Sequence, residues 1–509
     1  MGKRPGRVVT AATACAALLA AGGHAQPARA ASFGANDDTA LFQADGGAAY
    51  FRQMAALGLA QTVLTVRFAP SAPTAIDEAT RLDAVVRNAT AAGLRVVFAV
   101  YPYPPRELQA GMGSPQAFAT WLGGVAVRYP QVRQFTVMNE PNQTAFLRPQ
   151  FSAARTNVSA ATTGVYLAAA YDALKAVDPA IEVIGVGLSP RGNDDPRAPS
   201  NVSTSPVRFL AALGRWYRAS GRTQPLMDGF SFHPYPVQAT DPVDKPYVWP
   251  NAGLANLGRI KQALWDAFDG TPQPTTVGGL KLYLDEVGWQ VDTTGLAGYV
   301  GRENVPVTDE ASQAAIYGQL VRLAACDTDV AEVNFFGFYD DRRRTGFQAG
   351  LYRADGTPRP SASAVETAIG ETTLTGCSHF QPPWAPAAGV VGADLVRSRA
   401  LGRTTAVAGG SPTTVAVAFD VAEGARVTAT LERVDAPESA LARLLSVPEA
   451  ADLPSAGAAV AYGRGEVTLV LPPGLASGRY EVVVRFAAEA NDRRTTGLRG
   501  AILLVRPPP

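Results

Sequence analysis

Short apolar runs alternate with longer stretches of helical periodicity from about residue 31 to residue 370. Apolar runs bounded by polar and turn-forming residues are typical of strands buried on both faces of a parallel sheet. Eight such runs that alternate with helices predict an α/β fold, and specifically a (β/α)8 TIM barrel. The predicted strands are Ser32–Ala35, Thr62–Phe68, Arg95–Tyr101, Phe135–Glu140, Ile181–Gly187, Gly229–His233, Leu282–Glu286 and Val333–Phe338.

Helical patterns separate these runs. Apolar residues at helical spacing between Leu167 and Val177 are followed by Pro179, which ends the pattern. A second pattern, Ile316–Leu323, is preceded by Thr308 as the predicted N-cap. No glycine-rich phosphate-binding sequence follows the first predicted strand, which argues against a dinucleotide-binding fold.

Two connections between predicted elements are long, Ser189–Ser205 and Pro236–Gly253. Both are rich in proline, aspartate and asparagine, and neither shows helical periodicity. In a TIM barrel the segments that follow the strands leave the C-terminal face, where ligand sites lie. We therefore expect both segments to border a binding site.

The hydrophobic pattern changes after Pro382, where a proline-rich linker is followed by runs with a period of two. Such alternation, punctuated by glycine and proline, is typical of a β-sandwich. We predict a signal peptide at 1–30, the barrel at 31–380 and a C-terminal all-β sandwich domain at 386–509. The alternating apolar residues are Val415, Val417, Phe419 and Val421, then Val427, Ala429 and Leu431, then Tyr480, Val482, Val484 and Phe486.

The N-terminus has the features of a secretory signal peptide. Basic residues precede an apolar run, Val8–Ala21, that is too short to span a bilayer comfortably. Ala28–Ala30 has the small-x-small pattern of a cleavage site. We expect a secreted, extracellular mature protein without membrane insertion; a disordered or membrane-anchored N-terminus is the alternative.

Composition narrows the class of protein. Hydrophobic residues make up 47% and charged residues 17% of the 509 residues, which is typical of globular proteins. The formal net charge of +1 gives no strong field that would attract nucleic acid or an acidic membrane surface, and a neutral substrate is compatible with it. With three histidines and no His/Cys ligand spacing, we expect neither a metal site nor a cofactor. The oligomeric state stays open.

Three cysteines bear on the compartment. Cys15 would leave with the signal peptide. Cys326 and Cys377 lie near the ends of the last two helical segments of the predicted barrel, and an oxidising destination favours a disulfide between them. Two unpaired buried thiols are the alternative.

Two of the apolar strands end in a glutamate. Glu140 lies in Phe135–Pro141, and Glu286 lies in Leu282–Trp289. Burying an unpaired carboxylate is costly, so such a charge needs a partner or a function. As the fourth and seventh strands of a barrel, both would present their carboxyl groups at one mouth. A facing pair of carboxyl groups is what glycoside hydrolysis requires; a salt-bridged or solvated glutamate is the alternative for each.

These residues resemble glycoside hydrolase clan A, the retaining (β/α)8-barrel glycosidases, and among them cellulase-like and family 39-like bacterial proteins. In that clan the acid/base glutamate follows an asparagine after the fourth strand, and the nucleophile ends the seventh. Asn139-Glu140-Pro141-Asn142 matches the first motif, and Asp285–Trp289 resembles the second. The resemblance covers roughly residues 31–370, and it implies hydrolysis of O-glycosidic bonds with a preference for β linkages.

Further matches lie at other strand ends. Arg67 matches a basic residue that the clan often places near the nucleophile, and His233 with Tyr235 resembles the His-x-Tyr pair of some members. The eighth strand lacks the tryptophan that many members use as a sugar platform, and Phe338 or Tyr339 is the candidate substitute.

The resemblance implies a role for each catalytic residue. Glu140 would donate a proton to the leaving oxygen and later activate water, while Glu286 would attack the anomeric carbon. Arg67 and Tyr235 would keep Glu286 ionised and oriented. Asn139 would hydrogen-bond the sugar 2-hydroxyl.

Aromatic side chains near the predicted mouth are candidate sugar platforms, because ring faces suit the C–H faces of pyranosides. Trp289 would stack on a sugar, and Tyr247 and Trp249 in the second long connection are further candidates. His233 is also assigned to the substrate site. Structural alternatives exist for each: packing for Trp289, a satisfied core histidine for His233 and a mouth ion pair for Arg67.

The substrate class that follows is a poly- or oligosaccharide, and two other functions stay open. One is a catalytically inactive carbohydrate-binding barrel, which retention of both glutamates disfavours. The other is a transglycosylase that passes the same glycosyl-enzyme intermediate to a sugar acceptor. The sugar, the linkage and endo or exo action are not determined, and the C-terminal domain could brace the barrel or bind carbohydrate.

Overall fold

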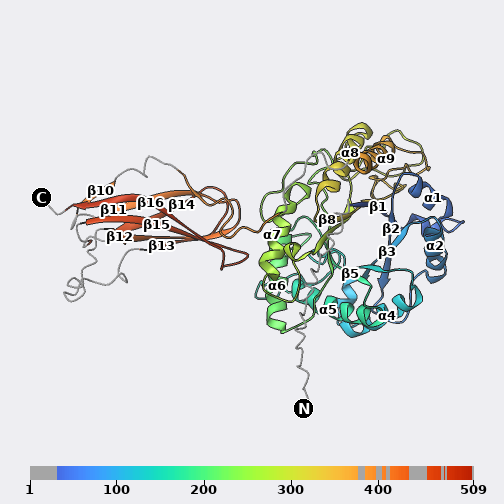
Figure 1. Cartoon of the computed structure of the whole chain (residues 1–509), viewed down its shortest axis with the longest axis horizontal. Coiled ribbons are helices and arrows are strands. Elements are labelled where there is room, and N and C mark those ends of the chain that lie inside the picture. Colours follow the sequence, from blue (N-terminus) through green and yellow to red (C-terminus); the bar gives the residue numbers. More distant parts are fainter. Residues whose placement is uncertain are drawn as a thin grey trace, which may run out of the picture.

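The computed structural model describes residues 31–375, 384–396, 404–407, 413–434, 455–471, 475 and 478–506. They form a barrel wrapped by helices and two β-sheets that project to one side of it (Figure 1). The predicted signal peptide, 1–30, and Cys377 lie outside the described residues. Cys326 is disulfide-bonded. Among the described residues, none of the helices combines the length and apolarity needed to cross a bilayer.

Eight parallel strands close the barrel in chain order, and β1 pairs with both β2 and β8. The predicted TIM barrel is therefore confirmed, with each predicted strand in its expected place. The strands are β1 Ser32–Asn36, β2 Gln61–Phe68, β3 Arg95–Pro102, β4 Gln134–Val137, β5 Glu182–Leu188, β6 Gly229–Phe232, β7 Lys281–Val287 and β8 Val330–Phe336.

The fourth strand is shorter than predicted. It ends at Val137, whereas the apolar run suggested a strand to Glu140. Met138 and Glu140 have φ angles of 75° and 37°, left-handed values that a strand does not contain. The chain therefore leaves the sheet before it reaches the glutamate.

Helices cover the outside of the barrel. At α8 the N-cap is Asp309, whose carboxylate accepts a hydrogen bond from the Ser312 N–H at 2.8 Å. The predicted N-cap, Thr308, instead donates its N–H to the Gln290 carbonyl. The helices are α1 Ala48–Ala56, α2 Ala79–Ala91, α3 Pro105–Gln109, α4 Pro115–Arg128, α5 Ser159–Val177, α6 Pro206–Ser220, α7 Leu257–Phe268, α8 Glu310–Cys326 and α9 Pro360–Thr375, with short 3-10 turns η1 Thr39–Phe42, η2 Leu254–Asn256 and η3 Thr276–Gly278.

The main apolar core lies between strands and helices, whereas a polar network occupies part of the barrel interior. Gln61 donates to Asn334 at 3.0 Å, and Asn334 donates to Asp285 at 3.3 Å. The Thr136 hydroxyl donates to the second Asp285 oxygen at 2.7 Å. All four side chains are buried. Buried polar groups need such partners, so the network fixes the strand residue that precedes Glu286.

The C-terminal region forms two sheets, in the orders β10-β16-β15-β12-β13 and β14-β11-β9. The alternating apolar residues identified in the sequence are buried in one core between them, which confirms the predicted β-sandwich. The strands are β9 Asp394–Leu395, β10 Thr404–Val407, β11 Thr413–Asp420, β12 Ala425–Arg433, β13 Ser455–Ala461, β14 Gly465–Leu471, β15 Gly478–Ala488 and β16 Thr495–Arg506.

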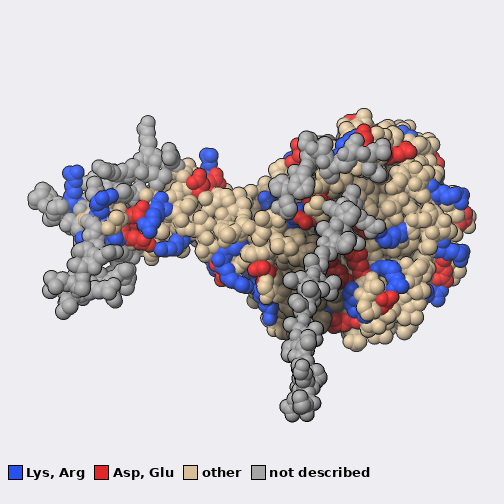
Figure 2. Space-filling model, in the orientation of Figure 1, with Lys and Arg blue, Asp and Glu red and all other residues tan. Residues whose placement is uncertain are grey.

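Charged side chains are spread over the face seen in Figure 2, where basic and acidic groups are interspersed. This matches the formal net charge of +1. Recognition of nucleic acid by charge depends on a basic patch or stripe. Among the described residues on this face, no large patch of one sign is visible.

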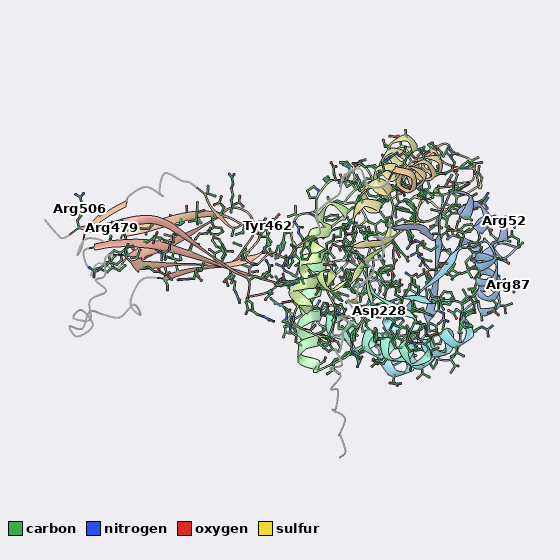
Figure 3. All side chains as sticks on the ribbon, in the orientation of Figure 1. Arg52, Arg87, Asp228, Tyr462, Arg479 and Arg506 are labelled. Carbon is green, nitrogen blue, oxygen red and sulfur yellow. The ribbon has the colours of Figure 1, made fainter. Side chains whose placement is uncertain are left out.

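One buried arginine joins the two domains. Arg494, between β15 and β16, donates to both oxygens of Asp266 in α7 and to both oxygens of Glu423, at 2.6–2.8 Å. The side chains of Arg494 and Asp266 are each 2% exposed. In Figure 3, Tyr462 marks the end of the sandwich near the barrel, and Arg506 marks the far end. The sandwich therefore has a polar, desolvated anchor on α7.

We expect Arg494→Leu to lower the free energy of unfolding by about 3–5 kcal/mol, because Asp266 and Glu423 would stay buried without their partner. Chemical denaturation followed by circular dichroism measures the change. Arg493→Leu is the matched control, since that neighbouring side chain is exposed, and it should change stability by less than about 0.5 kcal/mol. Equal effects of the two substitutions would contradict the anchoring role.

Candidate active site

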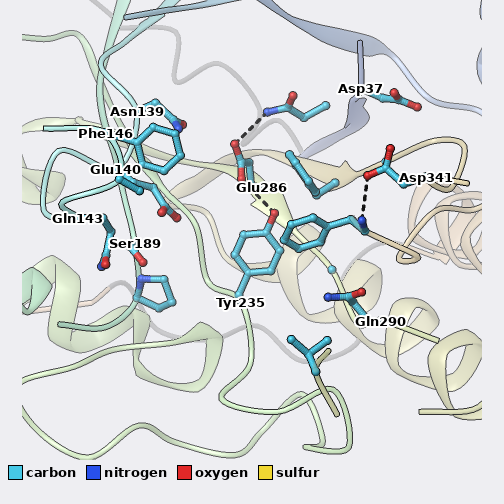
Figure 4. A pocket seen from close by; sticks show the side chains of 18 of the residues that line it. Asp37, Asn139, Glu140, Gln143, Phe146, Ser189, Tyr235, Glu286, Gln290 and Asp341 are labelled. Atoms are coloured by element: carbon cyan, nitrogen blue, oxygen red, sulfur yellow. Dashed lines mark hydrogen bonds between the residues drawn. The ribbon is translucent and has the colours of Figure 1, made fainter. Parts of the chain in front are cut away.

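Glu140 and Glu286 line one cavity of about 940 Å³ at the C-terminal ends of the barrel strands (Figure 4). Glu140 follows β4, and Glu286 lies near the end of β7. A carboxylate oxygen of one lies within 4.8 Å of a carboxylate oxygen of the other. Their side chains are 17% and 15% exposed. The two predicted catalytic residues therefore share one space that is largely shielded from solvent.

A turn after β4 carries Glu140. Its N–H donates to the Gly187 carbonyl at 2.8 Å, and its own carbonyl accepts from the Gln143 N–H at 2.8 Å. The φ of 37° is unusual for a residue with a side chain and costs on the order of 1–3 kcal/mol, so it persists only where surrounding contacts hold it. The two hydrogen bonds provide those contacts.

A β-bulge in β7 brings Glu286 to the cavity. Between Leu284 and Val287, β7 has one more residue than the β8 segment that pairs with it. Consecutive side chains of a regular strand point to opposite faces, and a bulge changes that alternation. As a result, Asp285 is hydrogen-bonded inside the barrel while Glu286 lines the cavity.

His233, directly after β6, lies between the two glutamates. Its Nδ1 is 3.3 Å from Glu140 Oε1 and 3.6 Å from Glu286 Oε2. Burial disfavours its charge, but the negative charges of both glutamates outweigh burial and raise its pKa to about 9. The imidazole is therefore protonated at neutral pH. Gly187, with φ 62°, permits this packing, because a Cβ there would lie 3.0 Å from His233 Nε2.

Each oxygen of Glu286 faces a donor. The Tyr235 hydroxyl donates to Oε2 at 3.0 Å, and the Asn36 amide donates to Oε1 at 3.5 Å (Figure 4). Burial raises the pKa of Glu286 to about 7, and the charge of Glu140 adds to that rise. The charge of His233 and the Tyr235 hydrogen bond act in the opposite direction. The carboxylate is thus oriented on both sides and ionises near neutral pH.

Arg67 lines the cavity, as expected of a residue near Glu286, but its side chain hydrogen-bonds Tyr101 and not Glu286. Its Nε donates to the Tyr101 hydroxyl at 3.1 Å, and its guanidinium lies 5.2 Å from the centre of the Tyr103 ring. Direct orientation of Glu286 therefore falls to Tyr235 and Asn36, and Arg67 supplies positive charge at the mouth.

Three candidate sugar platforms lie outside β8, and none of them is part of the cavity lining. They are Trp289, Tyr247 and Trp249. Trp289 is 1% exposed, and its indole N–H donates to a loop carbonyl at 2.8 Å, so no ring face is free for a sugar. Tyr247 and Trp249 are 7% and 8% exposed and are absent from the cavity lining. We assign all three to packing within or around the loops, a correction of the predicted stacking roles.

The cavity lining includes predicted and unpredicted residues. Asn139 lines it beside Glu140, and parts of both long connections border it as expected. Tyr339 and Phe336 supply rings near β8, whereas Phe338 is fully buried. The polar cluster Asn36–Asp38, directly after the first predicted strand, is a signal in the sequence that points to this part of the lining. Lining residues that the sequence analysis did not identify include Asn36, Asp37, Asp38, Gln143, Phe146, Gln290 and Asp341.

Among the described residues, one set of side chains has ligand atoms close enough together to hold a cation. It consists of Glu140, His233 and Glu286, whose ligand atoms all lie within 4.8 Å of one another. Carboxylate and imidazole are acceptable metal ligands. However, a histidine must be neutral to bind a metal, and the pKa of His233 is raised to about 9 by the glutamates. The imidazolium itself provides the positive charge that the carboxyl pair requires.

Comparisons with known proteins give structural likeness without close relatives. No family model matches the chain, and no curated protein matches it significantly. Among solved structures, it is similar to a family 39 glycoside hydrolase from Bacteroides cellulosilyticus WH2, with 15% identity over 87% of this chain and 81% of that one and a TM-score of 0.46. A glucosidase from Croceicoccus marinus has 13% identity, 93% and 92% coverage and a TM-score of 0.46.

An endo-1,4-beta-mannanase from Rhizomucor miehei has 13% identity over 68% of this chain and 95% of that one, with a TM-score of 0.45. With TM-scores below 0.5 and identities of 13–15%, these likenesses support no conclusion about the activity or substrate of this chain. A function for this chain must therefore be argued from its own residues.

We expect Tyr235→Phe to raise the pKa of Glu286 above its value of about 7, because the hydroxyl donates to the ionised form. Carboxyl ¹³C NMR of glutamate-labelled protein measures that pKa, with the signal assigned by its loss in Glu286→Gln. Tyr217→Phe is the matched control, since its hydroxyl donates to the Gln224 carbonyl outside the cavity lining. An unchanged Glu286 pKa in Tyr235→Phe would contradict the orienting hydrogen bond.

Proposed function

We propose that this protein is a secreted retaining glycoside hydrolase that cleaves O-glycosidic bonds, with a β preference, in a poly- or oligosaccharide. The observation that carries the proposal is the facing carboxyl pair, Glu140 and Glu286, with oxygens within 4.8 Å in one cavity. Secretion rests on the signal-like sequence before residue 31.

The short separation supports double displacement over inversion. Carboxyl groups about 5–5.5 Å apart are typical of retaining enzymes, whereas inverting enzymes separate them by about 6.5–9.5 Å to admit a water. The nearest carboxylate oxygens of Glu140 and Glu286 lie within 4.8 Å, which supports a retaining mechanism. A sugar bound against both groups would leave no room for a nucleophilic water on the side of Glu286.

The roles of the two glutamates follow from their contacts. Glu286 is held by the Tyr235 hydroxyl and the Asn36 amide, which suits a group that must attack one carbon from one direction. In the first step, Glu140 protonates the leaving oxygen while Glu286 bonds to the anomeric carbon and the glycosidic C–O bond breaks. In the second, water attacks that carbon, its proton passes to Glu140, and the ester bond to Glu286 breaks.

The electrostatics suit this sequence of steps. Glu286 must be ionised to attack, and the charge of Glu140 is one of the causes that raise its pKa. Protonation of Glu140 for the first step removes that repulsion. His233, protonated at neutral pH and within 3.6 Å of both, further favours the ionised nucleophile. One proton on Glu140 and one on His233 therefore give the state that can react.

The cavity wall suits a neutral sugar. Besides the two glutamates, its charged groups include three aspartates, Asp37, Asp38 and Asp341, and two arginines, Arg67 and Arg191. This excess of acidic groups disfavours a substrate that carries carboxylates. A volume of about 940 Å³ lies at the upper end of ligand cavities, which accords with more than one sugar unit.

We expect Glu286→Ala to abolish turnover of an aryl β-glycoside that the wild type cleaves and azide to restore it as the α-glycosyl azide, because azide enters from the face that Glu286 vacates. The matched variant, Glu140→Ala, should keep the glycosyl-enzyme step and give the β-glycosyl azide, since azide then attacks the intermediate from the opposite face. NMR of the products distinguishes the two anomers.

The same anomer from both variants would contradict the assigned roles. Absence of turnover by the wild type on a broad panel of β-glycosides and β-glycans, with glycan binding intact, would favour a binding protein. Transfer to an added sugar in place of water would favour a transglycosylase.

A further inference from the structure

The second long connection, Pro236–Gly253, touches both the cavity and the C-terminal domain. Its first residues line the cavity. Further along, Trp249 lies outside the cavity lining and packs against the sandwich. A single loop therefore connects the proposed catalytic centre to the second domain.

Two residues of the sandwich and one of the barrel enclose Trp249. The indole stacks on the Tyr462 ring, with centroids 5.8 Å apart and planes inclined by 25°. At Gly424 a Cβ would lie 2.1 Å from the indole, so the glycine leaves room for the ring. Arg208 of α6 lies 5.2 Å from the centre of the indole, and its Nε donates to Glu489 at 3.1 Å. The indole is thus fixed by side chains of both domains.

Two residues before Trp249, the loop is fixed to the cavity wall. The Tyr247 hydroxyl donates to the Tyr235 carbonyl at 2.9 Å. The Tyr247 carbonyl in turn accepts from the Arg259 guanidinium at 3.0 Å. Tyr247 is 7% exposed, and its ring lies against Gly253, where a Cβ would come within 2.6 Å. A shift of Tyr247 would therefore strain or break its hydrogen bond to the Tyr235 carbonyl.

Tyr235 completes the connection, because its hydroxyl donates to Glu286 at 3.0 Å. The route runs from Tyr462 of the sandwich to Trp249 by ring stacking, along the backbone through Val248 to Tyr247, and by hydrogen bonds through Tyr235 to the Glu286 carboxylate. This route is separate from the Arg494 anchor, which contacts α7 and makes no contact with the loop among its hydrogen bonds.

We propose that Trp249 is a positioning residue through which the C-terminal domain holds Tyr235 against Glu286. The domain then acts as part of the catalytic machinery and not only as a brace. The proposal rests on the proposed function for its effect on turnover, but the contact itself does not depend on it. Misplacement of a positioned group by about 1 Å can cost on the order of 100-fold in rate, so a loosened loop has a measurable effect.

Trp249→Ala should lower kcat by about tenfold or more with a smaller change in KM, because substrate contacts stay while the nucleophile loses its orientation. It should also raise the pKa of Glu286 in the same direction as Tyr235→Phe. The double variant should show no larger pKa shift than Tyr235→Phe alone. Trp249→Phe, which keeps a ring for stacking, should restore most of both properties.

Variants on the sandwich side separate positioning from stability. Tyr462→Ala should reproduce the Trp249→Ala effects, and Tyr462→Phe should not. Val470→Ala, at an exposed apolar residue toward the far end of β14, is the matched control and should change neither. The groups that face Glu286 are unaltered in all of these variants: Glu140 after β4, His233 and Tyr235 after β6, Asp285 on β7 and Tyr101 on β3.

A lower melting temperature in Trp249→Ala with an unmoved Glu286 pKa would show a structural role only and would overturn the proposal. Additive pKa shifts in the double variant would overturn it as well. If the wild type cleaves no glycoside, the proposed function fails, but the NMR titration of Glu286 still decides whether the C-terminal domain acts on that carboxylate.

Discussion

Repulsion between two carboxyl groups is the constraint on which the site depends. Glu140 and Glu286 approach within 4.8 Å in a cavity that leaves each mostly buried. Two negative charges this close cannot both be tolerated without compensation. His233 provides the compensating charge, and its own pKa is raised to about 9 by the pair it serves. In the mechanism that we propose, Glu140 and His233 each carry one proton when Glu286 attacks.

The barrel supplies this arrangement through departures from regular strand geometry. Left-handed backbone at Glu140 turns its side chain over the mouth, and the β7 bulge lets Asp285 and Glu286 face inward in succession. Asp285 is fixed by Thr136 and Asn334 inside the barrel. Such irregularities cost free energy locally, and the surrounding hydrogen bonds offset that cost. The apolar core between strands and helices holds the eight strands in register.

Much of the fold was predictable from the sequence, because a strand that is buried on both faces appears there as a continuous run of apolar residues. Glu140 and Glu286 were identifiable for the same reason, since a charge at the end of a buried strand is conspicuous. The bulge in β7 and the early end of β4 left no such record, because they arise from pairing between strands distant in sequence. Trp289 shows the limit most plainly: an aromatic residue just beyond a strand can face a ligand or the core, and only packing decides.

Trapping of the glycosyl-enzyme is the most direct test of the account. The reagent is the 2,4-dinitrophenyl 2-deoxy-2-fluoro derivative of a glycoside that the wild type cleaves. It should react once per chain, because the fluorine slows both formation and hydrolysis of the glycosyl-enzyme while the good leaving group keeps its formation fast. Peptide mass spectrometry should then locate the added sugar on Glu286, with no adduct in Glu286→Gln. An adduct on another residue, or hydrolysis with inversion and no adduct, would contradict the assignment of Glu286 as the nucleophile.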